Sequence, residues 1–495
     1  MTNPLLEQAK NIYGKTPDVV DKQIICCNKN LSLLFCKSMI NEDFLISGIL
    51  KPILEFQEDE VSIEILKNKI LSTANQEIIS DKSKLEEAII AKKVLLFIED
   101  EAEKCLAIDI VNYPVRLPSE PPTSAVIKGP REGFVEDLKT NVTLLRRRLM
   151  SENFDFEEMS VGKYTKTKVV VAYIKGIAKK SIYKSIINKI KKINIDGVVD
   201  SSYIINFLEQ KKNSIFRQVG TSEKPDIVVA KLLEGRVAIL VNNSPIVLTV
   251  PFLYIEDIQS SNDYYSNSNY TTFIRIIRLI GIFVSIIIPG FYLSLRFYHY
   301  NLVPFKFLVT IANSTQTIPF TPFLEIAFIL ILFQILYEVS LRLPHYLGLA
   351  TSIVGALILG DTGVKAGLIS PPGVMIIALS IISIYIVPDQ ADQLNLIRAV
   401  FIILGSGFGM FGIISGIVFI ICYLNSLQNY GSPYLAPLAP IVTPDLKDAL
   451  YKTNLTNMMQ RPKSIPNKNK VRLRKWKKKS RHANLAVCFL FRWLH

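Results

Sequence analysis

The chain has 495 residues, of which 49% are hydrophobic, and a formal net charge of +14. This length exceeds one domain and suits two or three. The charge is uneven: residues 1–278 carry 38 Lys and Arg against 36 Asp and Glu, residues 279–424 carry five of each, and residues 425–495 carry 14 against two. Because the excess lies in the last segment, the composition does not indicate a nucleic-acid-binding fold. The six cysteines are spaced neither for a zinc site nor for a disulfide framework.

The first half of the chain alternates apolar runs with amphipathic stretches, which is typical of mixed α/β structure. Lys93–Ile98 and Cys105–Val111 read as strands, and a proline-rich linker, Tyr113–Pro130, follows them. We therefore predict two soluble α/β lobes, an N-terminal lobe of residues 1–120 and a second lobe of residues 121–265.

The second lobe shows its own strands and helices. Lys168–Ile174 reads as a strand and Ser181–Ile193 as a basic amphipathic helix. The turn signal Asn242–Pro245 lies between two apolar runs and predicts a β-hairpin. No internal repeat at a fixed period is visible.

The stretch GPREGFVEDLKTNVTLLRRRL, at 129–149, predicts a linker helix over residues 133–149. One helical stripe carries its apolar residues, Phe134, Leu138, Val142, Leu145 and Leu149. The helix would end in Arg146, Arg147 and Arg148. Such a triplet is usually a solvated face, and the alternative is contact with a partner or with anionic lipid headgroups.

Residues 273–424 carry the signal of a helical membrane domain. Five segments have few or no charges: Leu279–Leu295, Pro322–Leu341, Tyr346–Gly360, Ala366–Val387 and Ala399–Leu424. A helical crossing needs about 20 residues. A soluble core of buried helices is the alternative, and the scarcity of Lys and Arg across this region opposes it.

Basic residues on both sides of this region place both flanks, and so both termini, in the cytoplasm. An even number of crossings is then required, so we predict about four crossings plus a short re-entrant or buried segment, residues 346–360. The loop Pro388–Asn395 has two aspartates and no basic residue, which suits the outer face.

Two glutamates lie in the second apolar segment, where an unpaired carboxylate costs a few kcal/mol. Glu338 has a partner one turn away, Arg342, and we predict that the two are coupled. The pair is either a structural ion pair at the membrane interface or part of an ion pathway. Glu325 has no partner nearby in the sequence.

The short segment 346–360 is rich in small and hydroxylated residues, which permit close helix approach and can face water. The candidates for lining or gating a pore are Thr351, Ser352, Gly355, Ala356 and Ile358. Plain helix association is the alternative, and several subunits would be needed to enclose a conduit.

Gly407, Gly409 and Gly412 match a dinucleotide-binding fingerprint, but they lie inside an uncharged span with no preceding strand. Helix packing is the better interpretation. The pairs of small residues that would let helices approach closely are Gly405 with Gly409 and Gly412 with Gly416.

Residues 425–495 are predicted to form a basic cytoplasmic tail, whose run VRLRKWKKKSR would contact anionic membrane lipids rather than nucleic acid. The chain has no GxSxG, Walker A, HExxH or kinase signature, and its serines and cysteines lack a suitably placed histidine. We therefore expect no enzyme activity, no cofactor and no metal.

Four blocks in order resemble the A-subunit family of spore germination receptors (GerA type). They are GPREGFVEDLKTNVTLLRRRL, KPDIVVAKLLEGRVAILVNNSPIVLTVP, LRLPHYLGLATSIVGALILGDTGVKAGLISP and SPYLAPLAP, and with their spacing they cover roughly residues 25–460. The apolar end of the chain, residues 483–495, departs from the usual hydrophilic tail of that family.

The resemblance implies a multi-pass protein of the spore inner membrane that acts with a transporter-like B subunit and a lipoprotein C subunit. It further implies self-association into an oligomeric, ligand-gated ion channel that couples germinant sensing to cation release. Two other classes compete with the channel, a secondary transporter and a non-conducting membrane scaffold. Inverted repeats and additional spans would favour the transporter, and neither is visible.

Overall fold

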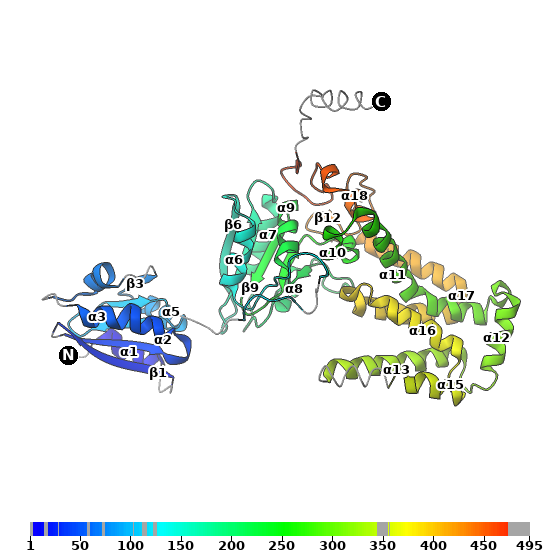
Figure 1. Cartoon of the computed structure of the whole chain (residues 1–495), viewed down its shortest axis with the longest axis horizontal. Coiled ribbons are helices and arrows are strands. Elements are labelled where there is room, and N and C mark those ends of the chain that lie inside the picture. The colour runs from blue at the N-terminus through cyan, green and yellow to red at the C-terminus, as the bar shows by residue number, and fades with distance from the viewer. Residues whose placement is uncertain are drawn as a thin grey trace, which may run out of the picture. The chain divides into compact units, whose positions relative to one another are not determined.

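The computed structural model describes residues 3–13, 18–27, 29–56, 60–71, 75–101, 103–110, 116–121, 126–343, 355 and 357–473. The chain divides into two compact units, Met1–Arg116 and Leu117–His495, each with its own core (Figure 1). The first unit is a single α/β lobe. The second unit combines another α/β lobe with the apolar helices.

The first unit is a five-stranded antiparallel sheet in the order β1-β2-β4-β5-β3. Its strands are β1 (Val19–Cys26), β2 (Lys29–Cys36), β3 (Gln76–Ile79), β4 (Val94–Ile98) and β5 (Cys105–Ile108). Its helices are α1 (Pro4–Tyr13), α2 (Glu42–Phe44), α3 (Lys51–Glu55), α4 (Ile63–Ile65) and α5 (Lys82–Ile90). Successive side chains of a strand point to opposite faces. Leu33 accordingly packs in the core that contains α3, and Leu34 in the core that contains α1 and α5.

The lobe of the second unit is built on another five-stranded antiparallel sheet, in the order β6-β7-β9-β10-β8. Its strands are β6 (Phe154–Val161), β7 (Thr167–Ile174), β8 (Gly220–Ser222), β9 (Val237–Val241) and β10 (Val247–Val250). Its helices are α6 (Leu138–Arg148), α7 (Lys180–Lys191), α8 (Ser201–Leu208) and α9 (Pro225–Glu234). Helices α6 and α9 cover one face of the sheet, and α7 and α8 cover the other. The predicted α/β class and the predicted β9–β10 hairpin are confirmed.

Helix α6 lies within the predicted helix 133–149 of the second lobe but begins only at Leu138. Asp137 caps it by accepting a hydrogen bond from the Thr140 amide at 2.7 Å. Before the cap, the side chain of Asn141 holds the backbone of Val135 through two hydrogen bonds of 2.6 and 2.9 Å. The apolar stripe of the sequence is nevertheless buried against the sheet.

The two sheets share one topology. Numbered along the chain within each lobe, the strands lie in the order first, second, fourth, fifth, third, and all neighbouring strands are antiparallel. In both lobes a helix precedes the first strand, two or more helical segments separate the second strand from the third, and one helix separates the third from the fourth. The lobes therefore repeat a topology although the sequence shows no repeat.

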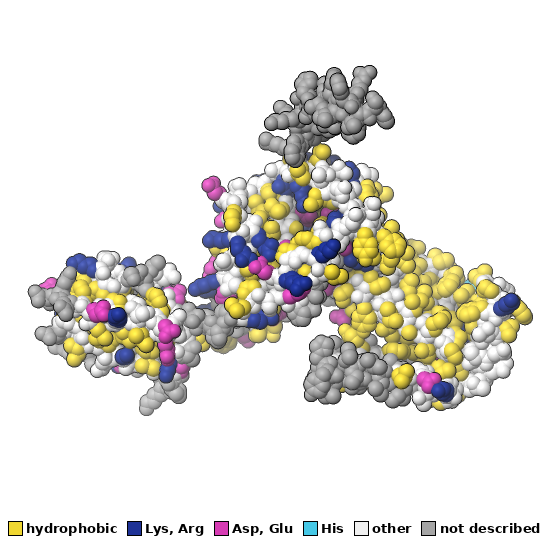
Figure 2. All heavy atoms as spheres, viewed as in Figure 1, with side chains coloured by type: hydrophobic (Ala, Val, Ile, Leu, Met, Phe, Trp, Pro, Cys, Tyr) yellow, Lys and Arg dark blue, Asp and Glu magenta, His cyan; other side chains and the backbone are white. Residues whose placement is uncertain are grey.

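The remaining helices form the apolar part of the second unit. They are α10 (Ser261–Tyr265), α11 (Ser268–Phe297), α12 (Phe305–Thr315), α13 (Pro322–Arg342), α15 (Gly363–Lys365), α16 (Pro371–Ile384) and α17 (Ala391–Ser426). Within the described residues, three helical stretches are long and apolar enough to cross a membrane: Ser268–Phe297, Pro322–Ser340 and Pro388–Ser426; α16 is shorter. Figure 2 shows apolar side chains covering this region, with few charges among them. The predicted helical membrane domain is thereby confirmed.

Helix α17 is a hairpin rather than one straight span. Its backbone turns at Gly409 (φ +60°, ψ −140°), a conformation that is readily accessible only to glycine. Beyond the turn the chain returns along itself, because a Cβ on Gly416 would lie 3.2 Å from Cζ of Phe401. In a straight helix these two residues would stand about 22 Å apart. The prediction of a single crossing over Ala399–Leu424 was wrong, because hydropathy does not register the backbone angles of one residue.

The helices have two distinct ends. We call the end beside Arg275 the lobe end and the end beside Arg296 the distal end. Helix α11 runs from the lobe end to the distal end, and α13 and α16 both run back to the lobe end, where the Tyr337 and Tyr385 rings meet with centroids 6.0 Å apart. The predicted count of about four crossings stays a prediction, and so does the predicted re-entrant or buried segment 346–360, most of which lies outside the described residues.

Residues 427–473 are folded against the second lobe. They contain β11 (Gln428–Asn429), β12 (Ser432–Pro433) and α18 (Leu446–Ala449). The Tyr434 hydroxyl donates to the carbonyl oxygen of Arg217 at 2.7 Å, and the Tyr430 hydroxyl to that of Leu208 at 2.8 Å. The predicted separate tail of residues 425–495 is thus corrected up to Leu473, because its apolar and aromatic residues complete the core of the lobe. Residues 474–495, with most of the basic run, lie outside the described residues.

Candidate functional site

Two buried polar junctions join the second lobe to the membrane helices. At the first, the carboxylate of Asp263 is 3% exposed and accepts hydrogen bonds from Arg275 Nε at 3.0 Å and from Arg278 at 2.8 and 2.9 Å. Arg275 is 1% exposed and also donates to the backbone carbonyls of Asp448 and Ala449. This junction fixes the start of α11 to both the lobe and the segment after α17.

The second junction holds the turn between α16 and α17. Arg217 pairs with Asp257 and, at 3.1 Å, with Asp389, while Gln390 Nε2 donates to Asp257 Oδ2 at 2.5 Å. The loop Pro388–Asn395 therefore begins against the lobe. Its predicted place on the outer face, opposite the lobe, was wrong, because its aspartate pairs with a lobe arginine that lies 172 residues earlier in the chain.

Beside these junctions the lobe contains a buried charge network on Glu256. Glu256 pairs with Arg236 and, at 2.8 Å, with Lys231, and it accepts from the Leu253 amide at 2.7 Å. Burial raises the pKa of Glu256, but the two positive charges outweigh burial and hold this pKa below its ordinary value. The network joins α9, the start of β9 and the segment leading to α10. It therefore ties the sheet to the segment from which the membrane helices begin.

At the distal end, Glu325 has partners that are distant in sequence. Its side chain is fully buried and pairs with Arg296 Nη1 at 2.9 Å. Its other oxygen accepts from the Ser370 amide at 2.8 Å and from the Ser370 hydroxyl. One carboxylate thus connects α11, α13 and the cap of α16. The sequence signal that could have found this pair was the scarcity of charges, because a buried carboxylate in this stretch of 146 residues has only five basic residues of the stretch to choose from.

The predicted pair one helical turn apart is formed in the structure, and so is a second pair with the same spacing. Glu338 Oε1 lies 2.6 Å from Arg342 Nη2, and Asp361 Oδ2 lies 2.6 Å from Lys365 Nζ. Both pairs are exposed in the single chain. Whether the Glu338–Arg342 pair couples to function stays a prediction.

Glycines provide close contacts between α11 and the first arm of α17, and between the two arms of α17. Gly405 faces Gly290 of α11 so closely that a Cβ on either residue would overlap the backbone of the other helix. Gly412 and Gly416 instead face the first arm of α17, at Leu404, and Gly409 forms the turn. The four predicted glycines therefore divide into one turn residue and three contact residues.

Of the basic triplet at the end of α6, two residues hold one glutamate. Arg147 and Arg148 both bind Glu132, Arg148 at 2.9 Å. Their hydrogen bonds and charges, that of Arg147 foremost, lower the pKa of Glu132. Arg146 lies over the ring of Phe156, 4.9 Å from its centroid. The triplet is thus engaged within the lobe, and binding of a partner or of lipid by these residues stays a prediction.

The pore candidates fall largely on residues that the structure does not describe. Thr351, Ser352 and Ala356 lie outside the described residues. A Cβ on Gly355 would lie 2.7 Å from Cδ2 of Leu336, so Gly355 faces α13. Ile358 begins a π-helical turn that runs to Thr362.

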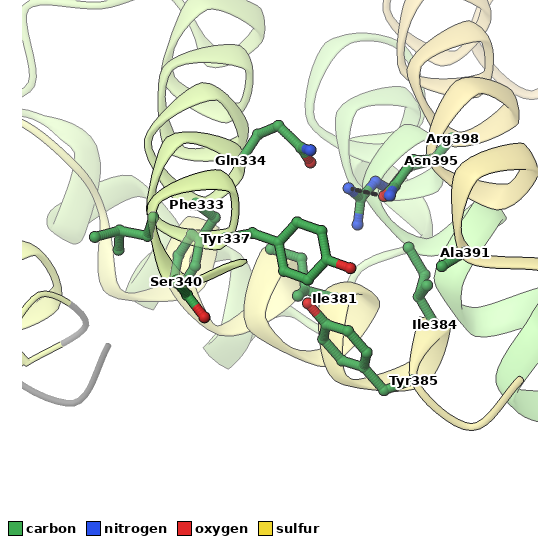
Figure 3. A pocket seen from close by; sticks show the side chains of 11 residues that line it. Phe333, Gln334, Tyr337, Ser340, Ile381, Ile384, Tyr385, Ala391, Asn395 and Arg398 are labelled. Atoms are coloured by element: carbon green, nitrogen blue, oxygen red, sulfur yellow. Dashed lines mark hydrogen bonds between the residues drawn. The ribbon is translucent and has the colours of Figure 1, made fainter. Parts of the chain in front are cut away.

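A cavity of about 240 Å³, with an apolar wall and several polar groups, lies between α13, α16 and α17 near the lobe end (Figure 3). Gln334 and Tyr337 line it from α13, Tyr385 from the end of α16, and Asn395 and Arg398 from α17. Figure 3 shows the Gln334 amide, the Tyr337 hydroxyl and the Arg398 guanidinium turned toward the same space. Sequence reasoning missed this site, because its members become neighbours only when the helices associate.

Comparison with known proteins assigns the family. The chain matches the model "Bacillus/Clostridium GerA spore germination protein" over residues 7–464. It is 32% identical over 474 residues to spore germination protein KA of Bacillus subtilis (strain 168), covering 94% of this chain and 87% of that protein. It is also 31% identical over 434 residues to spore germination protein B1 of the same strain, covering 87% and 89%.

A solved structure also matches. The crystal structure of the N-terminal domain of the A subunit of the Bacillus megaterium spore germinant receptor GerK3 is 24% identical and covers 51% of this chain and 97% of its own, with a TM-score of 0.22. The family that the four sequence blocks resemble is thus confirmed by the matches along the chain. The chain belongs to the GerA spore germination protein family.

Proposed function

We propose that this protein is the A subunit of a nutrient germinant receptor in the spore inner membrane. It acts there with a transporter-like B subunit and a lipoprotein C subunit, and several copies assemble into a ligand-gated ion channel that releases cations when germinant is sensed. The observation that carries the proposal is the pair of buried junctions at Asp263 and Asp257. A signal received by the soluble lobe needs a continuous physical connection to move membrane helices, and the two junctions supply it.

Self-association is supported by the apolar surface of the helices. Large side chains are exposed on the second arm of α17, including Phe411, Val418 and Phe419. Closed symmetry is the default for identical chains, and a ring of subunits can enclose a path that one chain does not. The decisive measurement is cation flux through liposomes that contain the purified A, B and C subunits, with and without germinant. Assembly without flux would favour the scaffold, and flux that requires a substrate gradient would favour the transporter.

Within that channel, Ile358 is expected to line or gate the path. Replacing Ile358 with alanine should release cations without germinant, because a smaller side chain widens a constriction. The matched control is Leu357→Ala, because this change also replaces a large aliphatic side chain with alanine, at the neighbouring position. Gly355→Ala tests a different feature, because the added methyl group would meet Leu336 of α13 and would not enter the proposed ion path. Equal flux through the Ile358→Ala, Leu357→Ala and parent channels would remove this segment from the path.

The Glu338–Arg342 pair is expected to matter in the assembled receptor. Either Glu338→Gln or Arg342→Gln leaves one charge alone beside an apolar helix face, where it is costly. Each should therefore lower assembly or germination, measured by co-purification and by cation release from spores. The charge-reversed double variant Glu338→Arg/Arg342→Glu should recover part of the loss. A parent-like response of both single variants would show that the pair has no role.

The proposed orientation places the lobe, residues 427–473 and the α16–α17 turn in the cytoplasm. In a variant without native cysteines, a cysteine at Ser266 or Asp389 should resist an impermeant thiol reagent added to intact cells. A cysteine at Asn301, at the distal end, should react. Reaction at Asp389 together with Asn301 would contradict both the orientation and the hairpin of α17.

A further inference from the structure

Arg398 is a buried cation without an ionic partner among the residues that the structure describes. It is 4% exposed, and its hydrogen bonds go to neutral groups, Asn395 Oδ1 at 2.7 Å and Ser380 Oγ at 3.3 Å. Two other arginines at the helices, the buried Arg275 and the partly buried Arg296, both pair with carboxylates. A charge held this way in an apolar region is costly unless an anion or water reaches it.

The space around Arg398 is large enough for a ligand. Besides the cavity of Figure 3, a second one of about 430 Å³ shares Gln334, Asn395 and Arg398 with it. The rest of its lining is one acid and an apolar wall, namely Asp392, Leu330, Ile331, Leu396 and Ala399. Ile331 and Leu396 are more than half exposed, so the space opens on the apolar outer surface of the helices.

The lining residues are ordered along the helix axis. Asp392 lies next to the lobe end, and Arg398 lies six residues further along α17, about 9 Å deeper. Ile331 of α13 lies six residues before Tyr337, which is at the lobe end, so it is also about 9 Å deep and lies at the level of Arg398. From the lobe end inward the site therefore presents a negative charge and then a positive charge beside an apolar wall.

We propose that this site binds phosphatidylethanolamine, with the ammonium group at Asp392, the phosphate at Arg398 and the start of an acyl chain along Leu330 and Ile331. The headgroup of this lipid has the complementary order of charges, with its amine outermost. Basic pockets between membrane helices are known to bind lipid headgroups, and an arginine binds phosphate through two donors. Phosphatidylglycerol would leave Asp392 without a cation, and free glycine would leave the apolar wall bare. The proposal does not depend on ion conduction.

The test uses the full chain in nanodiscs of phosphatidylcholine that contain equal minor amounts of phosphatidylethanolamine and phosphatidylglycerol. Lipids retained after mild extraction are counted by native mass spectrometry. The parent should retain phosphatidylethanolamine in preference to phosphatidylglycerol. Arg398→Gln should weaken this retention about tenfold, because a charge-assisted contact is lost. Asp392→Asn should remove the preference between the two lipids. Lys365→Gln, which removes an exposed cation at the distal end, should behave as the parent.

Further variants keep the test decisive if Arg398→Gln fails to fold. Gln334 is exposed on α13, so Gln334→Leu should fold and still reduce retention. Unchanged retention by Gln334→Leu, together with an unchanged lipid preference of Asp392→Asn, would overturn the proposal. A second result would also overturn it: free glycine stabilises the parent, and the parent retains no phosphatidylethanolamine. That result would indicate that the cavity binds a soluble zwitterion.

Discussion

The Glu325→Gln protein is expected to unfold in detergent at a temperature well below that of the parent. Glu325 is fully buried and is the ionic partner of Arg296 in the structure. Removing one member of a buried pair leaves the other charge unpaired, which typically costs about 3 to 5 kcal/mol. The neutral amide retains the shape of the side chain and part of its hydrogen bonding to Ser370. The decrease in unfolding temperature should therefore reflect mainly the cost of leaving the charge of Arg296 without its partner.

Glu338→Gln is the matched control for this experiment. It makes the same substitution on the same helix, but Glu338 is exposed and pairs with a neighbour one turn away. An exposed pair of this kind contributes about 0.5 kcal/mol or less, so the unfolding temperature should barely move. The double change Arg296→Met/Glu325→Leu should recover much of the stability lost by Glu325→Gln, because no buried charge remains. Equal unfolding temperatures for Glu325→Gln and Glu338→Gln would show that the distal cluster does not hold the helices together.

The second large effect is expected for Asp263→Asn. Asp263 accepts hydrogen bonds from Arg275 and Arg278, and it is 3% exposed. An amide cannot balance two guanidinium charges, so a loss of about 3 kcal/mol or more is expected. The lobe should also separate from α11 more often, which hydrogen exchange in residues 253–265 would report as faster exchange.

Asp445→Asn is the control for the junction. Asp445 accepts hydrogen bonds from the amide and hydroxyl of Ser464, at 2.7 and 2.6 Å, which are neutral groups. Its substitution should cost about 1 kcal/mol. In spores, Asp263→Asn should lower cation release more than Asp445→Asn does. Slow exchange in residues 253–265 of the Asp263→Asn protein would contradict a coupling role for the junction.

The sequence was most informative where a signal is local. Continuous apolar runs such as Val94–Ile98 predicted buried strands, because both faces of the sheet are covered by helices. The turn residues between β9 and β10 predicted the hairpin, because turn geometry depends on a few adjacent residues. The four blocks also identified the family that the comparisons confirm.

Charge pairs show the limit of local reasoning. Arg342 was found for Glu338 because the two stand one turn apart on α13. Arg296 was not found for Glu325, because it lies 29 residues earlier on another helix. Arg217 was likewise not found for Asp389, and the loop that carries Asp389 was placed at the wrong end of the helices for that reason.

By itself the sequence determined the α/β lobes, the apolar helical domain and the family, since these depend on periodicity, composition and contiguous motifs. The tertiary structure alone decided that α17 turns back at Gly409, that residues 427–473 complete the second lobe, and that Arg398 faces a cavity. Each of these follows from contacts between residues far apart in the chain, or from one backbone conformation. The physical reason is that hydropathy sums side-chain transfer energies along the chain, whereas ion pairs, turns and cavities depend on which segments meet in space.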